Sequence, residues 1–478
     1  MDQKRMPLFK QLINHAEQSP LSLHVPGHKY GEILIDEAKG YYNELLKLDA
    51  TELTGLDDLH SPDGVIKEAE ELLAQLYEVK RSFFLVNGST VGNLAMIMAA
   101  LKENDTVLVQ RNCHKSILNG INLAKAEPVF LGPIFDEDWG IARAVTLSTI
   151  KQAIEKYPHA KAVVLTYPNY YGMADEIEGI IELAHLNNIP VLIDEAHGAH
   201  FVGGALFPKS AVQLKADIVV QSAHKTLPAM TMGAYLHFNS ELLSENVVSQ
   251  YLHILQSSSP SYPIMASLDM ARYYLATFTN EDADYLGKKI NELRSELQKL
   301  NGIKVLSYKK GMGDPLKITI QSTTSLSGYE IQRLLEGEGI YTEMADPYNI
   351  VLVFPLLKAS MPYSIKEVIS RFEAALNPII MSEKEKAKIV FKKPAITKLA
   401  LNSEEMAASQ IGVVPLEKAV GGICAQLIIP YPPGIPLLFP GEIISREDID
   451  NINLLIESGA RFQGDSTFKH GEINIYLT

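Results

Sequence analysis

Two side chains in this sequence are suited to covalent cofactor chemistry, and each stands at the end of an apolar run. Lys225 follows the run 216–220 and lies in the hexapeptide Gln-Ser-Ala-His-Lys-Thr of residues 221–226. Asp194 ends a second apolar run, which begins at Ile189. A lysine at the polar end of a strand is usually only solvated. The pair is more informative, because two such strand ends can face one crevice.

An amine and a carboxylate that face one crevice match the needs of pyridoxal 5'-phosphate (PLP). The amine holds the aldehyde of the cofactor as a Schiff base, and the carboxylate keeps the pyridine nitrogen protonated, so that the ring can accept electrons. Lys225 and Asp194 fill these two roles. The sequence therefore predicts a PLP site built from the two strand ends.

A candidate phosphate site lies at residues 87–90, Asn-Gly-Ser-Thr, between a predicted strand and the start of a predicted helix. Backbone N–H groups, the hydroxyls of Ser89 and Thr90 and the positive end of a helix dipole all attract a phosphate. The alternative is that one of these hydroxyls only caps the helix. Ser222 and His224, in the hexapeptide of the lysine, can supply further phosphate contacts.

Three more residues are candidates for contact with the cofactor ring. His114 follows the predicted strand 106–110, where its flat ring can stack on the pyridine, although a lone histidine there is more typical of the protein surface. Ala196 and His197 follow the aspartate directly. The methyl group can pack against the ring face, and the imidazole can orient the carboxylate or contact the ring. Because all three stand at the carboxyl ends of predicted strands, they support one common site.

Strands and helices alternate from about residue 64 to residue 238, as in α/β domains. Such alternation predicts a mostly parallel sheet, here of seven strands, covered by helices on both faces, with ligands at the carboxyl ends of the strands. The expected strands lie near 82–86, 106–110, 127–131, 162–166, 190–194, 216–220 and 233–238. The expected helices lie near 65–78, 114–124, 147–156 and 175–187, and a further helix follows residues 87–90 and ends near residue 98.

The remaining residues predict further domains. A short amphipathic helix is expected at 8–17, and helices at 241–255 and 264–300 extend the large domain. The expected division is an N-terminal helix and active-site segment at 1–63, a large cofactor-binding domain at 64–301, a small α+β domain at 302–380 and a C-terminal α+β domain at 381–478.

The composition is that of a soluble globular protein of more than one domain, with 478 residues and 46% apolar side chains. The net charge of −14 argues against a nucleic-acid partner and suits a cationic small substrate. Cys113 and Cys424 are too few for a disulfide framework and are typical of a reducing cytoplasm. The apolar tract 423–444 carries five prolines, so no membrane span is expected. His24 and His28 lack neighbouring ligands, so no metal site is expected.

Six motifs together resemble those of a known family. They are His-Val-Pro-Gly-His-Lys at 24–29, Leu-Asp-Asp-Leu-His at 56–60, Asn-Gly-Ser-Thr at 87–90, Asp-Glu-Ala-His-Gly-Ala-His at 194–200, Ser-Ala-His-Lys-Thr at 222–226 and Pro-Tyr-Pro-Pro-Gly-Ile-Pro at 430–436. In this order they resemble the ornithine/lysine/arginine decarboxylases of the aspartate-aminotransferase fold, PLP fold type I. The short bacterial members are the most similar, since the first motif falls at residue 24 and leaves no room for the wing domain through which the long members build decamers. The resemblance implies a homodimer.

The resemblance also assigns roles by position. Lys225 would be the Schiff-base lysine, Asp194 the partner of the pyridine nitrogen and His114 the stacking ring. A hydroxyl at Ser258 would reach the phosphate of the neighbouring protomer, so that the active sites of the dimer are shared. Either the lysine or His224 would return a proton to Cα. The residues around the phosphate would be Ser89, Thr90, Ser222 and His224.

The implied reaction is decarboxylation of a basic amino acid to a polyamine precursor: lysine to cadaverine, arginine to agmatine or, as the least expected case, ornithine to putrescine. Asp57, Asp58 and Glu442 are the candidates for binding the cationic side chain, and no spacing in the sequence separates the three substrates. Two alternatives stay open. One is another enzyme of the same fold, an aminotransferase or an aldolase, with Arg371 or Arg461 as a carboxylate partner. The other is a PLP-binding regulator, which would need a DNA-binding motif for which the first residues leave no room.

Overall fold

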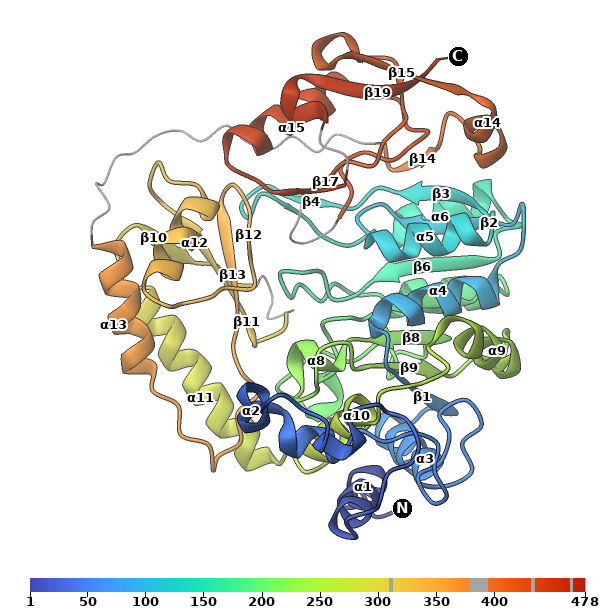
Figure 1. The fold of residues 1–478 in the computed structure, drawn as a ribbon. Helices are drawn as coiled ribbons and strands as arrows, with labels where there is room; N and C mark the ends of the chain where they lie inside the picture. Colours follow the sequence, from blue (N-terminus) through green and yellow to red (C-terminus); the bar gives the residue numbers. More distant parts are fainter. Residues whose placement is uncertain (309–312, 378–393, 431–434, 465–466, 478) are drawn as a thin grey trace. The chain divides into compact units, whose positions relative to one another are not determined.

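The structure, a computed structural model, describes residues 1–308, 313–377, 394–430, 435–464 and 467–477. Figure 1 shows its helices and strands and labels many of them. By internal contacts the chain divides into two units. Unit 1 consists of Met1–Ala100 and Pro190–Asn280, and unit 2 consists of Leu101–Ile189 and Glu281–Thr478. The four-part division expected from the sequence stays a prediction.

Four strands of unit 1 belong to the main sheet. They are β1 (Arg81–Leu85), β7 (Val191–Asp194), β8 (Ile218–Gln221) and β9 (Ala234–Phe238), hydrogen-bonded in the order β1-β9-β8-β7. β7 and β8 are parallel, with Asp194 opposite Val220, whereas β9 is antiparallel to both of its neighbours. Nearly every residue of these strands is buried, as expected when both faces of a sheet are covered. The carboxyl ends of β7 and β8 therefore lie side by side.

Helices and short turns complete unit 1. They are α1 (Pro7–Glu17), η1 (Lys29–Gly31), α2 (Asp36–Leu46), α3 (Val65–Tyr77), α4 (Gly88–Ala100), η2 (Phe201–Gly203), α8 (Ala223–Thr226), α9 (Glu245–Leu255) and α10 (Tyr262–Ala276). α4 packs against β8, β9 and α9. Gly92 makes this close approach possible, because a Cβ at that position would lie 2.7 Å from the side chains of Leu85 and Val220. The helix that carries the candidate phosphate site is thus fixed against the strand that leads to Lys225.

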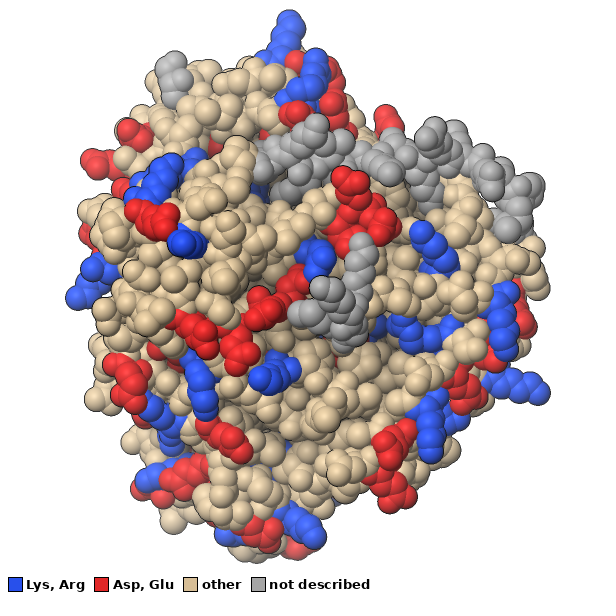
Figure 2. All heavy atoms as spheres, turned by 180° about the vertical axis from the view of Figure 1, so that it is seen from behind, with Lys and Arg blue, Asp and Glu red and all other residues tan. Residues whose placement is uncertain are grey.

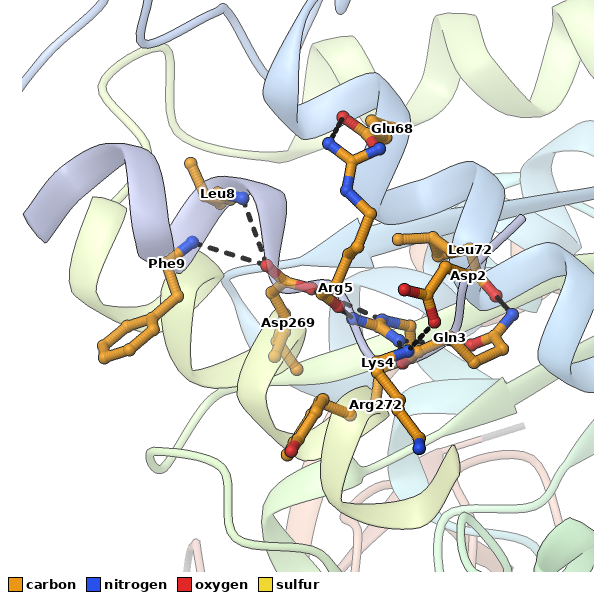
Figure 3. Close-up of polar contacts among 12 residues, drawn as sticks. Asp2, Gln3, Lys4, Arg5, Leu8, Phe9, Glu68, Leu72, Asp269 and Arg272 are labelled. Atoms are coloured by element: carbon orange, nitrogen blue, oxygen red, sulfur yellow. Dashed lines mark hydrogen bonds and ion pairs between the residues drawn. The ribbon is translucent and has the colours of Figure 1, made fainter. Parts of the chain in front are cut away.

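The N-terminal residues are anchored on α10 by a buried ion pair (Figure 3). Asp269 and Arg272 are both fully buried and lie 2.9 Å apart. The carboxylate of Asp269 accepts hydrogen bonds from the backbone N–H groups of Leu8 (3.1 Å) and Phe9 (3.3 Å), while Arg272 donates to the carbonyl oxygen of Gln3 (2.9 Å). A carboxylate from another helix therefore satisfies the first N–H groups of α1, whose own N-cap residue makes no side-chain cap.

Unit 2 contributes four more strands to the main sheet. They are β2 (Thr106–Gln110), β3 (Glu127–Leu131), β6 (Ala162–Thr166) and β14 (Ile396–Lys398), in the order β6-β2-β3-β14. The first three are parallel, and β14 is antiparallel to β3. The prediction of a mostly parallel α/β sheet is confirmed, and all seven predicted strands belong to it. In the part of the chain that the structure describes, the sheet has an eighth strand, which lies outside the predicted large domain. The additional strand, β14, has three residues, Ile-Thr-Lys, and such a short run gives no periodic signal.

Further elements of unit 2 flank these strands. They are β4 (Phe135–Asp136), β5 (Ile141–Ala142), α5 (Lys115–Leu123), α6 (Leu147–Lys156) and α7 (Glu178–Leu186). A second, antiparallel sheet consists of β10 (Ile303–Val305), β11 (Lys317–Ser322), β13 (Asn349–Val353) and β12 (Met344–Ala345). The helices in the same part of the chain are α11 (Asn280–Leu297), α12 (Gly328–Gly337) and α13 (Ile365–Leu376). The single helix expected at 264–300 is wrong, since α10 ends at Ala276 and α11 begins at Asn280. The hydroxyl of Thr277 donates to the carbonyl oxygen of Tyr273 (2.7 Å), a local bond that competes with continuation of the helix.

The C-terminal part of unit 2 has a separate apolar core. Its elements are α14 (Ser403–Ala408), β15 (Gln410–Pro415), η4 (Leu416–Lys418), β16 (Ile423–Cys424), β17 (Ile429–Pro430), α15 (Arg446–Glu457), β18 (Phe462–Gln463), η5 (Thr467–His470) and β19 (Glu472–Leu477), with a sheet in the order β15-β19-β16. Residues such as Ile428, Leu438, Ile452 and Phe468 are buried together in this core. Within the described ranges, none of the helices combines the length and apolarity needed to span a membrane. On the face drawn in Figure 2, Lys and Arg side chains are interspersed with Asp and Glu.

Candidate active site

Lys225 is held in a short turn at the carboxyl end of β8. The strand ends at Gln221, and the one-turn helix α8 begins two residues later. The backbone N–H of Lys225 donates to the carbonyl oxygen of Ser222 (3.1 Å), and its amine nitrogen Nζ lies 3.1 Å from Nε2 of His197. His197 is buried and follows β7. The predicted lysine is therefore in contact with a side chain from the strand end that carries Asp194.

Asp194 is buried at the end of β7, and two N–H donors fix its carboxylate. The side-chain amide of Asn93 donates to one oxygen (3.0 Å), and the backbone N–H of Ala196 donates to the other (3.2 Å). Asn93 was not among the residues predicted from the sequence. Its position on α4, one turn after Ser89 and Thr90, was the available signal, because residues three or four apart share one helix face.

The candidate phosphate site forms where β1 leads into α4. Gly88 has a φ of +77°, a conformation that suits glycine, and its N–H donates to the carbonyl oxygen of Met232 (2.9 Å). The hydroxyl of Ser222 donates to that of Ser89 (2.8 Å), so the structure brings these two predicted residues together. Ser89 and Thr90 already belong to the first turn of α4, and neither stands at the N-cap position.

His224 also lies in this region, with Nδ1 2.9 Å from the carbonyl oxygen of Gly233. Because a carbonyl oxygen can only accept, Nδ1 carries the proton of this hydrogen bond. Ala196 stands between Asp194 and His197, and its carbonyl oxygen accepts from the N–H of Ser222 (3.3 Å).

Ser258 lies in an exposed turn beside the candidate phosphate site of its own chain. The neighbouring N–H of Ser257 donates to the side-chain oxygen of Asn87 (3.2 Å), and the carbonyl oxygen of Ser257 lies 2.8 Å from Nε2 of His60. The turn thus joins the loop that carries His60 to Asn87, the residue that precedes α4. The role of Ser258 across a dimer stays a prediction.

The carboxylate of Asp57 binds the backbone at the start of α3. It accepts hydrogen bonds from five backbone N–H groups, those of Asp58, Asp63, Gly64, Ile66 and Lys67. Partial burial alone would raise the pKa of Asp57, but these N–H groups outweigh burial and lower it. Asp58 accepts one backbone N–H, from His60 (2.9 Å). The structure therefore gives Asp57 a helix-capping role that sequence analysis did not predict.

Two predicted site residues belong to unit 2. His114 is the N-cap of α5, and its Nδ1 accepts from the N–H of Ser116 (3.2 Å). Glu442 is buried in an ion pair with Arg111, which donates to both carboxylate oxygens (3.1 and 2.8 Å). One of these oxygens also accepts from the N–H of Phe439 (2.9 Å). Both oxygens of Glu442 are therefore used inside the protein, which favours a structural role over contact with substrate.

The residues of unit 1 form a donor and acceptor set that fits PLP. The carboxylate of Asp194 and the amine of Lys225 stand at the ends of the adjacent parallel strands β7 and β8. The N-terminus of α4 lies at the end of β8, where the hydroxyls of Ser89 and Ser222 are hydrogen-bonded. Such a set can hold an aldehyde, a pyridine nitrogen and a phosphate of one molecule. Within the described ranges, no group of three or more His, Cys, Asp or Glu side chains is arranged to hold a metal ion.

Comparison with known proteins gives two family matches. Residues 6–312 match the family described as "Orn/Lys/Arg decarboxylase, major domain", and residues 383–474 match "Orn/Lys/Arg decarboxylase, C-terminal domain". Together these matches cover most of the chain.

Individual relatives agree with the family matches. The chain is 45% identical to the uncharacterized protein YaaO of Bacillus subtilis, over 98% of both chains. It is 35% identical to the arginine decarboxylase of the same organism, over 98% of this chain and 97% of that one. Among solved structures, the lysine decarboxylase LdcF of Francisella novicida shares the fold with a TM-score of 0.80 at 21% identity, over 98% of this chain and 80% of that one. The chain belongs to the ornithine/lysine/arginine decarboxylase family.

Proposed function

We propose that the protein is a PLP-dependent decarboxylase of a basic amino acid, with arginine or lysine as the substrate. The observation that carries the proposal is the pair of strand ends on which Asp194 and Lys225 stand, joined by the contact of His197 with the lysine amine (3.1 Å). Members of the family and their fold-type I neighbours are PLP enzymes. When bound, PLP supplies a ring that accepts the electron pair left at Cα when the bond to the carboxylate breaks.

Each side chain then has a definite task. Lys225 binds the cofactor through its amine, and His197 holds that amine in place and can accept or return its proton. Asp194, fixed by two N–H donors, supplies the negative charge that keeps the pyridine nitrogen protonated. The N-terminus of α4 would bind the phosphate with Ser89, Thr90, Ser222 and His224.

His114 remains our candidate for stacking on the cofactor ring, and its role as N-cap of α5 leaves the orientation of its ring fixed by Ser116. For the proton that returns to Cα, two candidates stand: the amine of Lys225 and Nε2 of His224. Because Nδ1 of His224 is bound to the carbonyl oxygen of Gly233, this ring presents Nε2 in a fixed direction.

The substrate is proposed from the relatives and from the acidic residues. The arginine decarboxylase that is 35% identical over nearly the whole chain favours arginine over lysine and ornithine. Of the three acidic candidates, Asp57 is occupied by five backbone N–H groups and Glu442 by Arg111. Asp58 is therefore the residue that we retain for contact with the cationic side chain.

A homodimer is supported by an unusual apolar surface in the early part of unit 1. Leu21, Leu23 and Tyr41 are 81%, 90% and 88% exposed, and Ile33 and Ile35 are also largely exposed. The helix α2 has no buried residue. So much exposed apolar side chain in one continuous segment is unfavourable in water and marks an interaction site. We propose that a second copy of the chain covers residues 21–42. We also propose that the protein works in the cytoplasm, where the buried thiols of Cys113 and Cys424 stay reduced.

The activity is tested with purified protein supplied with PLP. We expect release of carbon dioxide and of agmatine or cadaverine from arginine or lysine, without any need for a keto acid. Lys225→Ala should abolish both turnover and the visible absorbance of the covalently held cofactor. Decarboxylation by Lys225→Ala at the parental rate would end the assignment, and a strict need for a keto acid would favour the aminotransferase alternative.

The homodimer is tested by sedimentation velocity on the parental protein and on Leu23→Asp/Tyr41→Asp. We expect a dimer for the parental protein and a monomer for the variant. A variant with the exposed Leu186 of α7 changed to Asp serves as the control. A parental monomer at micromolar concentration would contradict the proposal.

A further inference from the structure

A row of buried polar side chains crosses unit 1, with one member in or directly after each strand of its part of the sheet. Ser82 of β1 lies opposite His237 of β9, and the Ser82 hydroxyl is 2.8 Å from Nδ1 of the histidine. Nε2 of His237 lies 3.1 Å from the side-chain oxygen of Gln221, the last residue of β8. The amide group of Gln221 donates in turn to the carboxylate of Glu195, the residue after β7. All four side chains are almost completely buried.

The direction of every hydrogen bond in this row is fixed by its chemistry. The amide nitrogen of Gln221 donates to Glu195, so its oxygen must accept from His237. Nε2 of His237 therefore carries the proton, and Nδ1 accepts from the hydroxyl of Ser82. Burial lowers the pKa of His237 to about 3, so the ring is neutral, and it stacks on Tyr77 with ring centroids 4.1 Å apart. The whole row thus donates toward one carboxylate.

Glu195 receives two further donors and has no spare room. The hydroxyl of Ser210 (2.6 Å) and the backbone N–H of Ala211 (2.7 Å) donate to it. A Cβ on Gly198 would lie 2.6 Å from the Cγ of Glu195, so glycine is needed there. Burial raises the pKa of Glu195 to about 8, although the donors from Ser210, Ala211 and Gln221 favour the charged form. Keeping such a group in the interior is costly unless every donor is in place.

The position of Glu195 relates it to the site. Successive residues of a strand point to opposite faces of the sheet. Asp194 faces α4, whose Asn93 it binds, and Glu195 points to the other face, toward the row. Its N–H continues the ladder between the two strands by donating to the carbonyl oxygen of Val220 (2.9 Å). Gln221, which it holds, is followed directly by the turn that carries Lys225.

We propose that Glu195 is a positioning residue: by holding Gln221, its carboxylate fixes the turn of Lys225 relative to Asp194 from the face of the sheet that the cofactor does not occupy. The inference rests on the proposed function, because it concerns the same lysine and aspartate. It adds a carboxylate that touches neither the cofactor nor the substrate and that sets the geometry of the two residues that do.

Glu195→Gln is the test variant, and Glu70→Gln is its matched control. Glu70 is also a buried glutamate of unit 1 with a pKa raised by burial, to about 7, and it accepts hydrogen bonds from Arg81 (2.8 Å) and from the N–H of Phe84 (2.9 Å). We expect Glu195→Gln to lower kcat about tenfold with little change in KM, because small displacements of reacting groups are costly to rate. Glu70→Gln should lower kcat less than about twofold, even at an equal loss of thermal stability.

A second readout does not depend on activity. Hydrogen–deuterium exchange of the protein without added PLP should show faster exchange at residues 222–226 in Glu195→Gln than in Glu70→Gln. Visible circular dichroism of the PLP-loaded proteins should show a changed cofactor band only in Glu195→Gln. Equal kcat, equal exchange and equal dichroism in the two variants would overturn the inference. If Glu195→Gln does not fold, Gln221→Leu breaks the same link from β8 and must give the same results.

A swapped pair provides the rescue. In Glu195→Gln/Gln221→Glu, the glutamine at position 195 can accept from the N–H of Ala211 and donate to the glutamate at position 221. That glutamate can also accept from Nε2 of His237. We expect the double variant to regain at least half of the lost kcat and the slow exchange at residues 222–226. Recovery of neither would also overturn the inference. A parental protein without PLP binding or decarboxylation would instead refute the proposed function, while the exchange comparison would still decide the role of Glu195.

Discussion

The variant Glu442→Gln tests whether this carboxylate is a structural partner of Arg111 or a contact for substrate. The pair is bidentate, and the Arg111 side chain is only 2% exposed. Arg111 also donates to the carbonyl oxygens of Pro436 (3.0 Å) and Leu437 (2.9 Å), and its guanidinium lies 3.7 Å from the ring centroid of Phe439. The substitution therefore removes the negative charge and leaves the positive charge buried among its other partners.

Breaking a buried ion pair by removing one partner costs about 3–5 kcal/mol. Glutamine keeps one acceptor oxygen, and the two carbonyl oxygens and the ring of Phe439 still stabilise the guanidinium. The lower end of the range applies, so we expect Glu442→Gln to lower the free energy of unfolding of the protein by about 3 kcal/mol. Arg111→Met/Glu442→Met, which removes both charges, should be no less stable than the single variant.

The sequence contains one tryptophan, Trp139, which is buried in unit 2 and stacks on Tyr308. Its fluorescence during urea unfolding therefore reports on the unit that contains the ion pair. The same protein samples should be assayed for kcat and KM with arginine and lysine. An unchanged unfolding curve for Glu442→Gln, together with a KM raised tenfold or more, would refute the structural role and restore Glu442 as a substrate residue.

Three further predictions concern unit 1. Asp57→Ala should lower the stability by about 2 kcal/mol, because several N–H groups at the start of α3 lose a charged hydrogen-bond acceptor. Asp58→Ala loses one backbone partner and should cost less than about 1 kcal/mol in thermal unfolding. The pKa of Asp57 is lower in the folded protein than in the unfolded chain, so its stabilisation is present above the unfolded pKa and is lost as the pH falls through the folded pKa. The parental protein and Asp57→Ala should therefore converge in stability at acid pH. Asp194→Asn should retain cofactor binding and lose most of kcat, and an unchanged kcat would remove the charge role from Asp194. Gly92→Ala should be destabilising by about 1–3 kcal/mol, since its Cβ would lie 2.7 Å from Leu85 and Val220, and an unchanged melting temperature would contradict the close packing of α4.

Local signals in the sequence were sufficient to predict the strands that are buried on both faces of the sheet. The predicted strands 106–110, 127–131 and 162–166 coincide with β2, β3 and β6, because a continuous apolar run of about five residues between turns is typical of a central strand. The same signals placed Lys225 and Asp194 at strand ends, where a parallel sheet gathers its functional residues. What these runs determined was the order of the strands along the chain and which polar residues follow them.

Partners that are distant in the sequence were decided only by tertiary structure. Glu442 looks like a substrate carboxylate until folding brings it to Arg111, 331 residues away. Asn93 shares a helix face with Ser89 and Thr90, but the sequence does not show that it binds Asp194. Nor does the sequence show that Glu195 binds Gln221. Hydrogen bonds and ion pairs of this kind form because the interior leaves no water for buried polar groups, and the packing of helices and strands selects which groups meet.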